Sequence, residues 1–295
     1  MQANATTAAF DAAKVAEKAA MMRRDIIAML SEAGSGHPGG SLSSTDIVAT
    51  LYFGGILKHD AANPTDPARD RFILSKGHAA PVLYAALAES GYFEPAELAT
   101  LRKLDSRLQG HPDCRKLPGV EVSTGSLGQG LSIATGLAAG LRSNAGDAEA
   151  QHVFALLGDG EIEEGQVWEA AMYAAHLGLA NLVAIVDNND LQIDGHCSEL
   201  VGLTGIAARF AAFGWKAIEV DGHDVEKLHA ALAEARAYAE GPVAIVASTV
   251  KGKGVSFMEG QAGWHGKAPN AEQTQQALEE LGGAPAWYLE LVKGR

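Results

Sequence analysis

Apolar and polar residues follow one another along this chain in blocks that predict buried strands and amphipathic helices in turn. Apolar residues at helical spacing predict helices, and short uninterrupted apolar runs between turn residues predict strands buried on both faces. The predicted strands are residues 71–75, 152–157, 182–187, 215–220 and 243–248. The predicted helices are residues 7–33, 44–53, 80–89, 94–104, 128–141, 167–177 and 225–238, with two short helices after a glycine-rich loop at 252–268. This alternation predicts an α/β fold whose mainly parallel sheet carries helices on both faces.

The chain has the composition of one compact domain. Hydrophobic residues make up 47% of its 295 residues, which is ample for a core. The sequence contains no internal repeat, low-complexity tract or linker-like segment. Since length alone sets only a prior on the number of domains, we expect a single domain over residues 1–295, in which residues 270–295 form a C-terminal helical extension.

Charge and cysteine content exclude several classes of partner. The net charge of −13 and the lack of a Lys/Arg run argue against a nucleic-acid-binding protein. The only cysteines, Cys114 and Cys197, have no metal-like spacing and are typical of a reducing compartment. The first 20 residues lack the cationic start and apolar block of a signal peptide. No apolar run approaches a membrane span. We therefore expect a cytoplasmic protein without nucleic-acid or membrane partners.

Polar residues follow two of the predicted strands at the point where each strand ends. Gly158-Asp159-Gly160 comes after the strand at 152–157, and Asn188-Asn189 comes after the strand at 182–187. In open α/β sheets ligands bind at the carboxyl ends of the strands, and oxygen ligands of this kind suit Mg²⁺ or Ca²⁺ together with phosphate oxygens. The spacing predicts a metal-bound diphosphate site. Taken alone, the same residues also fit an ordinary βαβ crossover with polar turns.

A glycine-rich turn, Gly125-Ser-Leu-Gly-Gln-Gly130, immediately precedes the predicted helix at 128–141. Backbone N–H groups at the positive end of a helix can bind an anion. The glycines do not follow the order of the dinucleotide-binding fingerprint. Tight helix packing explains such a turn about as well as anion binding does.

Histidines are concentrated on glycine-rich segments. The five that directly follow a glycine are His37, His78, His111, His196 and His223, and a sixth, His265, lies in Gly263-Trp-His-Gly266. A histidine on a glycine-rich loop has no core to fill, and loops on a rigid scaffold carry many catalytic groups. Together they favour proton transfer near neutral pH. His176 lies on a predicted helix and is expected to be a packing or surface residue. His223 could simply begin the helix that follows and is left outside the site.

Together these motifs resemble the diphosphate-binding part of the transketolase family, specifically the separate N-terminal subunit of split transketolases. The shared motifs, in the family's order, are Ser35-Gly-His-Pro-Gly39, Ser75-Lys-Gly-His78, Gly110-His-Pro112, Gly125-Ser-Leu-Gly-Gln-Gly130, Gly158-Asp-Gly160, Glu164-Gly165, Asp187-Asn-Asn-Asp-Leu-Gln-Ile-Asp-Gly195, Asp221-Gly-His-Asp224, Lys251-Gly-Lys-Gly254 and Trp264-His-Gly266. Two positions depart from the family's pattern. Gly125-Ser126 replaces the commoner Gly-Pro, and Gly39-Gly40-Ser41 follows the first His-Pro where members vary. The second departure bears on donor selectivity and leaves the chemistry unchanged.

The resemblance implies thiamine diphosphate and Mg²⁺ (or Ca²⁺) as cofactors. It implies that Asp159, Asn189 and the backbone carbonyl of Leu191 bind the metal. The residues that it places against the cofactor are Gly125, Ser126, Leu127, Gly160, Asn189, Lys251, His78 and His265. The residues that it places at the hydroxyls of the donor sugar, as catalytic groups, are His37, His111 and His265. The implied reaction transfers a two-carbon ketol unit from a ketose (phosphate) donor to an aldose (phosphate) acceptor.

The resemblance also implies a partner chain. The family supplies a glutamate to the aminopyrimidine ring, and most contacts to the substrate phosphate, from a pyrimidine-binding domain that this sequence does not contain. A C-terminal transketolase subunit is therefore expected, in an α₂β₂ complex. A 1-deoxyxylulose-5-phosphate synthase or a 2-oxo acid dehydrogenase component shares the diphosphate module, but the loop histidines favour ketol transfer.

A non-catalytic subunit that retains the fold is the remaining alternative. Such a subunit would be expected to lose Asp159, Asn189 or the loop histidines, and all of them are present. The sequence leaves the sugar pair open, and with it the choice between central pentose phosphate metabolism and a specialised sugar pathway.

Overall fold

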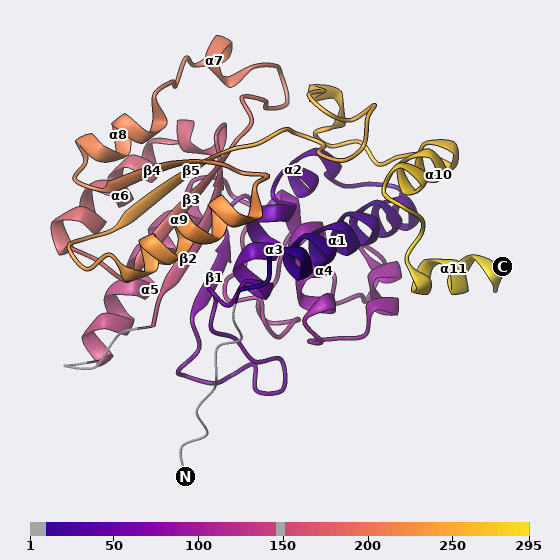
Figure 1. The fold of residues 1–295 in the computed structure, drawn as a ribbon, viewed down its shortest axis with the longest axis horizontal. Coiled ribbons are helices and arrows are strands. Elements are labelled where there is room, and N and C mark those ends of the chain that lie inside the picture. The colour runs from indigo at the N-terminus through magenta and orange to yellow at the C-terminus, as the bar shows by residue number, and fades with distance from the viewer. Residues whose placement is uncertain (1–9, 146–150, 295) are drawn as a thin grey trace.

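The computed structural model describes residues 10–145 and 151–294, which contain one five-stranded parallel sheet (Figure 1). The strands are β1 (Arg71–Leu74), β2 (Val153–Gly158), β3 (Leu182–Asn188), β4 (Lys216–Asp221) and β5 (Val243–Ser248). They lie in the order β1-β2-β3-β5-β4, and every neighbouring pair is parallel. The predicted α/β fold with a parallel sheet is confirmed.

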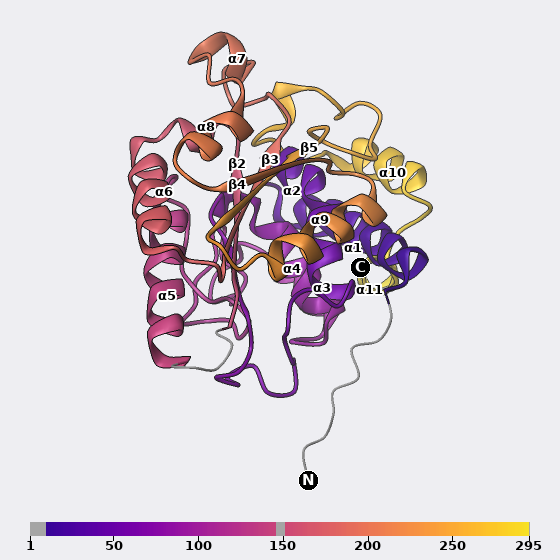
Figure 2. The ribbon, with the colours of Figure 1, turned by 60° about the vertical axis from the view of Figure 1, so that its left-hand side comes forward.

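Helices cover both faces of the sheet (Figure 2). Helices α1 (Ala12–Ala33), α3 (Thr45–Phe53), α4 (Ala80–Glu89) and α9 (Val225–Ala237) cover one face. Helices α5 (Gln129–Ala145), α6 (Gly165–Leu177) and α8 (Ile206–Ala212) cover the other face. Successive side chains of a strand point to opposite faces. In β3, Val183 and Ile185 therefore pack toward α1, whereas Ala184 and Val186 pack toward α5 and α6.

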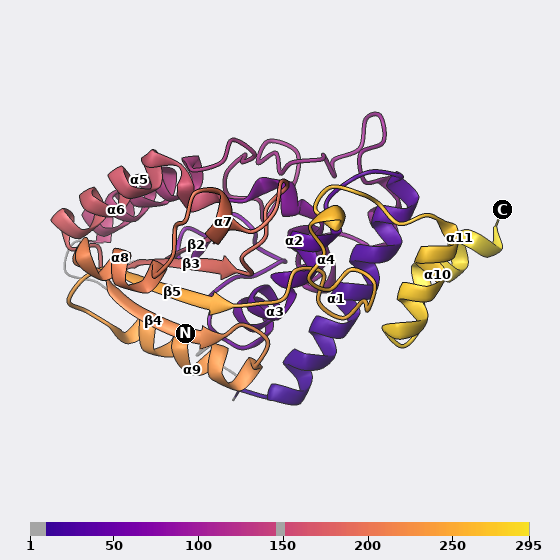
Figure 3. The same ribbon diagram turned by 90° about the horizontal axis from the view of Figure 1, so that it is seen from above.

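The remaining short elements gather at the carboxyl end of the sheet or at the C-terminus of the chain. They are α2 (Pro38–Ser43), α7 (Cys197–Leu200), α10 (Ala271–Glu280), α11 (Ala286–Lys293) and the 3₁₀ helices η1 (Gly77–Ala79), η2 (Pro95–Thr100), η3 (Glu161–Glu163) and η4 (Ala262–Trp264). Seen from above, the strands point toward α2 (Figure 3). Among the described residues, no helix is both long and apolar enough to span a membrane.

The helices predicted at 7–33 and 94–104 differ most from the structure, and the helix predicted at 128–141 extends to Ala145. The first helix begins at Ala12 because Asp11 caps it, its side chain accepting a hydrogen bond from the N–H of Lys14; predicted residues 7–9 lie outside the described residues. The helix predicted at 94–104 is wrong. Residues Pro95–Thr100 form the 3₁₀ helix η2, and the chain then turns at Arg102, whose φ of 60° lies in the left-handed region.

Three short helices were not predicted, namely α2, α7 and α8. The Pro-Gly-Gly-Ser composition of α2 is typical of a loop, but its serine hydroxyls bond back to carbonyls of the same turn. Ser41 Oγ donates to the carbonyl of His37 at 2.7 Å, and Ser44 Oγ donates to the carbonyl of Gly40 at 2.8 Å. Burial and these local bonds therefore form a helix where propensity predicts a turn.

The C-terminal helices pack on the same core as the rest of the chain. Asn270 caps α10 in a capping box with Gln273, and Leu278 joins the core beneath α1. Helix α11 is anchored by Trp287, whose indole N–H donates to Asp25 Oδ1 of α1 at 2.7 Å. Both predicted C-terminal helices are present.

The buried carboxyl group of Asp25 makes the stability of the fold depend on pH. Burial raises its pKa from 3.8 to about 7, although the hydrogen bond from Trp287 opposes the rise. Because the folded protein keeps a proton that the unfolded chain releases, the free energy of unfolding falls as pH rises from about 4 to about 7. We expect Asp25→Asn to remove this part of the pH dependence, which amounts to roughly 4 kcal/mol at most, in denaturant unfolding at a series of pH values.

Trp287→Phe supplies the control for this prediction, since it keeps an aromatic ring in the core and removes only the N–H donor. Without that donor the ionised carboxylate is less favoured, so the fall in stability should continue to a higher pH than in the wild type. Parallel pH profiles for the wild type and Asp25→Asn would exclude Asp25 as their source.

Candidate active site

A cavity of about 240 Å³ lies at the carboxyl edge of the sheet, beyond the ends of β2 and β3. The predicted site residues that line it are His37, His78, Gly125, Leu127, Asp159, Gly160, Asn189, Leu191, Lys251 and His265. Two predicted residues do not line it. Ser126 is exposed in the turn between Gly125 and Leu127. His111 lies just behind Gly125: a Cβ added to Gly125 would lie 2.9 Å from the ring of His111.

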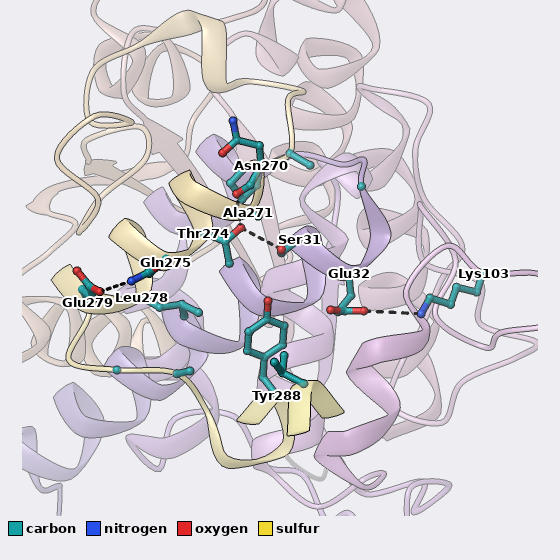
Figure 4. Close-up of a pocket in the computed structure, with 16 residues that line it drawn as sticks. Ser31, Glu32, Lys103, Asn270, Ala271, Thr274, Gln275, Leu278, Glu279 and Tyr288 are labelled. Atoms are coloured by element: carbon teal, nitrogen blue, oxygen red, sulfur yellow. Dashed lines mark hydrogen bonds and ion pairs between the residues drawn. The ribbon is translucent and has the colours of Figure 1, made fainter. Parts of the chain in front are cut away.

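A larger cavity of about 850 Å³ lies elsewhere, between the end of α1 and the helices α10 and α11 (Figure 4). Its polar groups are already paired in part: Thr274 Oγ1 donates to Ser31 Oγ at 2.9 Å, and Lys103 lies 4.0 Å from Glu32. It contains none of the predicted site residues. The smaller cavity, with its convergent titratable groups, is therefore the candidate active site.

The carboxylate of Asp159 is fixed by backbone N–H groups on both of its oxygens. Oδ1 accepts the N–H of Gly160 at 2.9 Å, and Oδ2 accepts the N–H of Asn189 at 2.8 Å and the N–H of Asp190. Burial, followed by the nearby Asp187 carboxylate, raises the pKa of Asp159 to about 6. A positive charge beside it would offset both effects.

Three residues with oxygen donors line the cavity together. They are Asp159 and Asn189, through their side chains, and Leu191, through its backbone carbonyl. The ammonium of Lys251 donates to the Leu191 carbonyl at 2.6 Å, so the position already attracts a cation. This donor set is of the kind that Mg²⁺ or Ca²⁺ prefers, and the three predicted metal ligands are brought together.

A second buried carboxylate, that of Asp187 in β3, connects the segment that follows β1 with helix α2. It is ion-paired with Lys76 and accepts hydrogen bonds from Ser43 Oγ at 2.6 Å and from Thr249 Oγ1. Burial alone would raise the pKa of Asp187, but Lys76 and the hydroxyl donors outweigh burial and hold it below its usual value. Sequence reasoning assigned no role to Lys76 or Asp187, although both lie within quoted motifs.

Three histidines from segments far apart in sequence face one another in the cavity. His37 precedes α2, His78 lies on η1, and His265 follows η4. Their ring centroids lie 5.2 Å (His37–His78), 5.5 Å (His37–His265) and 5.1 Å (His78–His265) apart. Within the described residues, no group bonds to the buried Nδ1 of His37 or of His265. Two buried ring nitrogens are thus available to a ligand.

Burial makes these imidazoles weak bases. It lowers the pKa of His37 to about 4, that of His265 to about 3 and that of His78 to about 2, and neighbouring cations add to each effect. Proton transfer near neutral pH would therefore involve rings whose pKa values lie below the usual imidazole value. At pH 7 they are neutral rings, which can accept a proton or hydrogen-bond a hydroxyl group.

The other glycine-linked histidines have different surroundings. His111 is exposed, and burial of part of its ring, followed by Arg102, lowers its pKa. His223 lies between α3 and the segment after β5: its Nδ1 donates to Asp46 at 2.7 Å, and its Nε2 accepts the N–H of Val250 at 2.8 Å. His196 is exposed and bonds to Asp190 at 3.0 Å. His176 is exposed on α6, as expected of a surface residue.

The glycine-rich turn before α5 serves packing as well as the site. Gly125 and Gly128 have φ of 146° and 81°, where residues with side chains are strained. A Cβ at Gly128 would lie 2.7 Å from that of Glu164, and one at Gly130 would overlap Ser75. Close packing is therefore confirmed; anion binding by the turn stays a prediction, although Gly125 and Leu127 do line the cavity.

Residues 14–293 match the family described as "Transketolase, thiamine diphosphate binding domain". The chain belongs to the transketolase family. The transketolase structure from Leishmania mexicana superimposes with a TM-score of 0.87 at 33% identity, over 92% of this chain and 42% of that chain. The family resemblance is confirmed, and with it a thiamine-diphosphate-binding fold.

Relatives named as subunits match this transketolase-family chain over nearly their whole length. The 6-deoxy-6-sulfo-D-fructose transketolase subunit SqwG of Clostridium sp. (strain MSTE9) is 40% identical, over 90% of this chain and 94% of that protein. An apulose-4-phosphate transketolase subunit from Phocaeicola vulgatus is 38% identical, over 88% of this chain and 90% of that protein. Human transketolase is 43% identical over 88% of this chain but only 41% of its own length. The chain thus spans about two fifths of the human enzyme.

Thiamine diphosphate and a divalent cation fit the residues of the cavity. The Leu191 carbonyl, which lines the cavity together with Asp159 and Asn189, already accepts a hydrogen bond from an ammonium group. The unpartnered Nδ1 atoms of His37 and His265 belong to rings that line the same cavity, where a ligand can satisfy them.

Proposed function

We propose that this chain is the N-terminal subunit of a thiamine-diphosphate-dependent transketolase that moves a two-carbon ketol unit from a ketose (phosphate) to an aldose (phosphate). The observation that carries the proposal is one cavity that holds Asp159, Asn189 and the Leu191 carbonyl beside His37, His78 and His265. The match to transketolase subunits over nearly their whole length supports a two-subunit enzyme. In this proposal residues 1–295 act as one domain with a helical extension at 270–295.

In this proposal, one part of the cavity binds the metal and the diphosphate. Asp159, Asn189 and the Leu191 carbonyl would hold Mg²⁺ (or Ca²⁺) against the diphosphate, with the Gly125–Leu127 turn and Gly160 beside it. When bound, thiamine diphosphate supplies a nucleophilic carbon for the ketose carbonyl, because the cofactor carries the hard chemistry.

In this proposal the histidines bind hydroxyl groups and transfer protons, and the lysine contributes a positive charge. His37, His111 and His265 would bind hydroxyls of the donor, and His37 and His265 would accept and return a proton there. Lys251 brings a positive charge to a cavity that must take up a diphosphate.

We propose that a C-terminal subunit with a pyrimidine-binding domain completes the site, in an α₂β₂ complex located in the cytoplasm. The two free cysteines, Cys114 and Cys197, support such a location. Large apolar side chains are exposed at and near the cavity, with Leu127 38% and Ile193 70% exposed. Exposed apolar side chains beside a polar site are typical of an interaction surface.

Purified alone, this chain is expected to show no ketol transfer from xylulose 5-phosphate to ribose 5-phosphate, because the glutamate that activates the cofactor would come from the partner. Addition of the complementary chain should restore activity and give a heterotetramer in light scattering. Robust ketol transfer by the single chain would contradict its assignment to a two-subunit enzyme. Pyruvate, tested beside the ketose as donor, distinguishes ketol transfer from oxo-acid chemistry.

The names of the subunit relatives suggest which donors to test. A panel should contain xylulose 5-phosphate, 6-deoxy-6-sulfo-D-fructose and the ketose donor used by apulose-4-phosphate transketolase. Ranking them by kcat/KM in the assembled complex would identify the donor class.

A further inference from the structure

A third buried carboxylate, Glu161, lies at the wall of the cavity and has no assigned role. Glu161 begins η3, directly after the Gly158–Gly160 turn, and is 3% exposed. Its Oε1 accepts the N–H of Gly128 at 3.1 Å and the hydroxyl of Ser75, and its Oε2 accepts the N–H of Gly158 at 3.0 Å. One side chain thus accepts hydrogen bonds from three separate segments.

Each of these segments carries part of the candidate site. Ser75 directly follows β1 and leads into the segment with His78. Gly158 precedes Asp159, and Gly128 closes the turn that holds Gly125 and Leu127. Glu161 is therefore bonded both to the turn proposed for the diphosphate and to the turn proposed for the metal.

Burial raises the pKa of the Glu161 carboxyl group. Hydrogen bonds from Ser75, Gly158 and Gly128, together with the positive charge of Lys76, oppose that rise. Among the described residues, no lysine or arginine forms an ion pair with Glu161. Gly128 directly precedes α5, a helix of 17 residues, so the carboxylate lies at the positive end of that helix. The helix end is therefore partly occupied by a group of the chain itself, and the turn between Gly125 and Leu127 remains for a ligand.

We propose that Glu161 is a positioning residue that fixes the Gly125–Leu127 turn relative to the Asp159 turn. The residues proposed to bind the diphosphate and those proposed to bind the metal can then contact the same cofactor. This inference rests on the proposed function. Without the carboxylate, the N–H groups of Gly128 and Gly158 lose their acceptor inside the protein. The turn cannot close onto β1 to compensate, because Gly130 already touches Ser75.

Asp70 provides a control away from the cavity, although it also forms an ion pair with Arg236 at 2.6 Å. It is also 3% exposed and also accepts two backbone N–H groups, those of Lys58 and His152, each at 2.9 Å. It directly precedes β1, at the opposite edge of the sheet from the cavity. A general loss of stability should follow from either change, whereas a loss of cofactor affinity should follow only from the change at Glu161.

The test compares Glu161→Gln with Asp70→Asn in the complex of the full chain with its complementary subunit. The glutamine amide has one acceptor oxygen where the carboxylate has two, so at least one of the three donors loses its acceptor. By calorimetry with Mg²⁺ present, we expect Glu161→Gln to raise the Kd for thiamine diphosphate about 10-fold to 100-fold. At saturating cofactor its kcat should stay close to wild type, because the reacting groups are untouched. Asp70→Asn should lower the melting temperature and leave the Kd unchanged.

Hydrogen exchange on the full chain gives a readout that needs no cofactor. The amides of Gly128 and Gly158 should exchange faster in Glu161→Gln and at the wild-type rate in Asp70→Asn. Ser75→Ala removes one of the three donors and should raise the Kd by a smaller factor, about 3-fold to 10-fold. It also carries the test if Glu161→Gln does not fold.

The outcomes separate this inference from the proposed function. A wild-type complex that does not bind thiamine diphosphate would overturn the proposed function. A wild-type complex that binds it, while Glu161→Gln binds equally well, would overturn the role of Glu161. The same conclusion follows from an unchanged Kd in Ser75→Ala where Glu161→Gln cannot be purified.

Discussion

Replacement of Asp159 by alanine is expected to abolish retention of thiamine diphosphate by the assembled enzyme. Asp159 is the only carboxylate among the proposed metal ligands, and its Oδ2 also accepts the N–H groups of Asn189 and Asp190. The substitution removes the charge that faces a divalent cation and the support of the loop that carries the other two ligands. Loss of a group that only supports a metal ligand costs about 10-fold to 100-fold in metal affinity, so loss of the ligand should cost more.

Calorimetry of thiamine diphosphate binding, with Mg²⁺ and with EDTA, measures this effect. Wild-type binding should disappear with EDTA, and binding by Asp159→Ala should be weak under both conditions. Asp224→Ala is the control, since Asp224 also accepts two backbone N–H groups but does so at the start of α9, away from the cavity. Normal affinity of Asp159→Ala in the presence of Mg²⁺ would show that Asp159 does not bind the metal.

The sheet and the proximity of Asp159 to Asn189 could be predicted from sequence because both depend on local patterns. Strands such as β3 begin with an uninterrupted apolar run, here Leu182 to Val186, because both faces are buried. Parallel strands place their carboxyl ends at one edge of the sheet. Asp159 and Asn189 follow two adjacent strands, so their proximity follows from topology alone. Helix α4 was predicted with its observed bounds, because apolar residues fill it and Glu89 ends it.

The buried polar network could not be predicted, because its partners are far apart in sequence. The ion pair of Lys76 with Asp187 joins residues that no local pattern relates. The contacts of Glu161 with Ser75 and Gly128 likewise depend on how the turns pack in space. The same reason applies to the histidines. Their position on glycine-rich loops favoured proton transfer near neutral pH, but burial, which lowers the pKa of His265 to about 3, depends on the folded structure.

Alanine at His37 or His265 is expected to reduce turnover strongly while the cofactor stays bound. Both rings lie in the cavity, and each has a buried Nδ1 that no group bonds to within the described residues. Burial lowers the pKa of His37 to about 4 and that of His265 to about 3, so at pH 7 both are neutral and can accept a proton from a substrate hydroxyl. General acid–base assistance of this kind contributes about 10²-fold to 10⁴-fold in rate, and kcat should fall by that range.

His176→Ala supplies the comparison, because His176 is exposed on α6 and packs against the ring of Tyr173. Its kcat and KM should stay close to wild type when the partner subunit is present in excess. Binding of thiamine diphosphate to His37→Ala and His265→Ala should weaken much less than turnover falls, since the metal ligands and the Gly125–Leu127 turn are unchanged. Full turnover by His265→Ala would exclude its catalytic role. If His176→Ala were the variant that lost activity, the histidines that face the cavity would not be the ones that handle the proton.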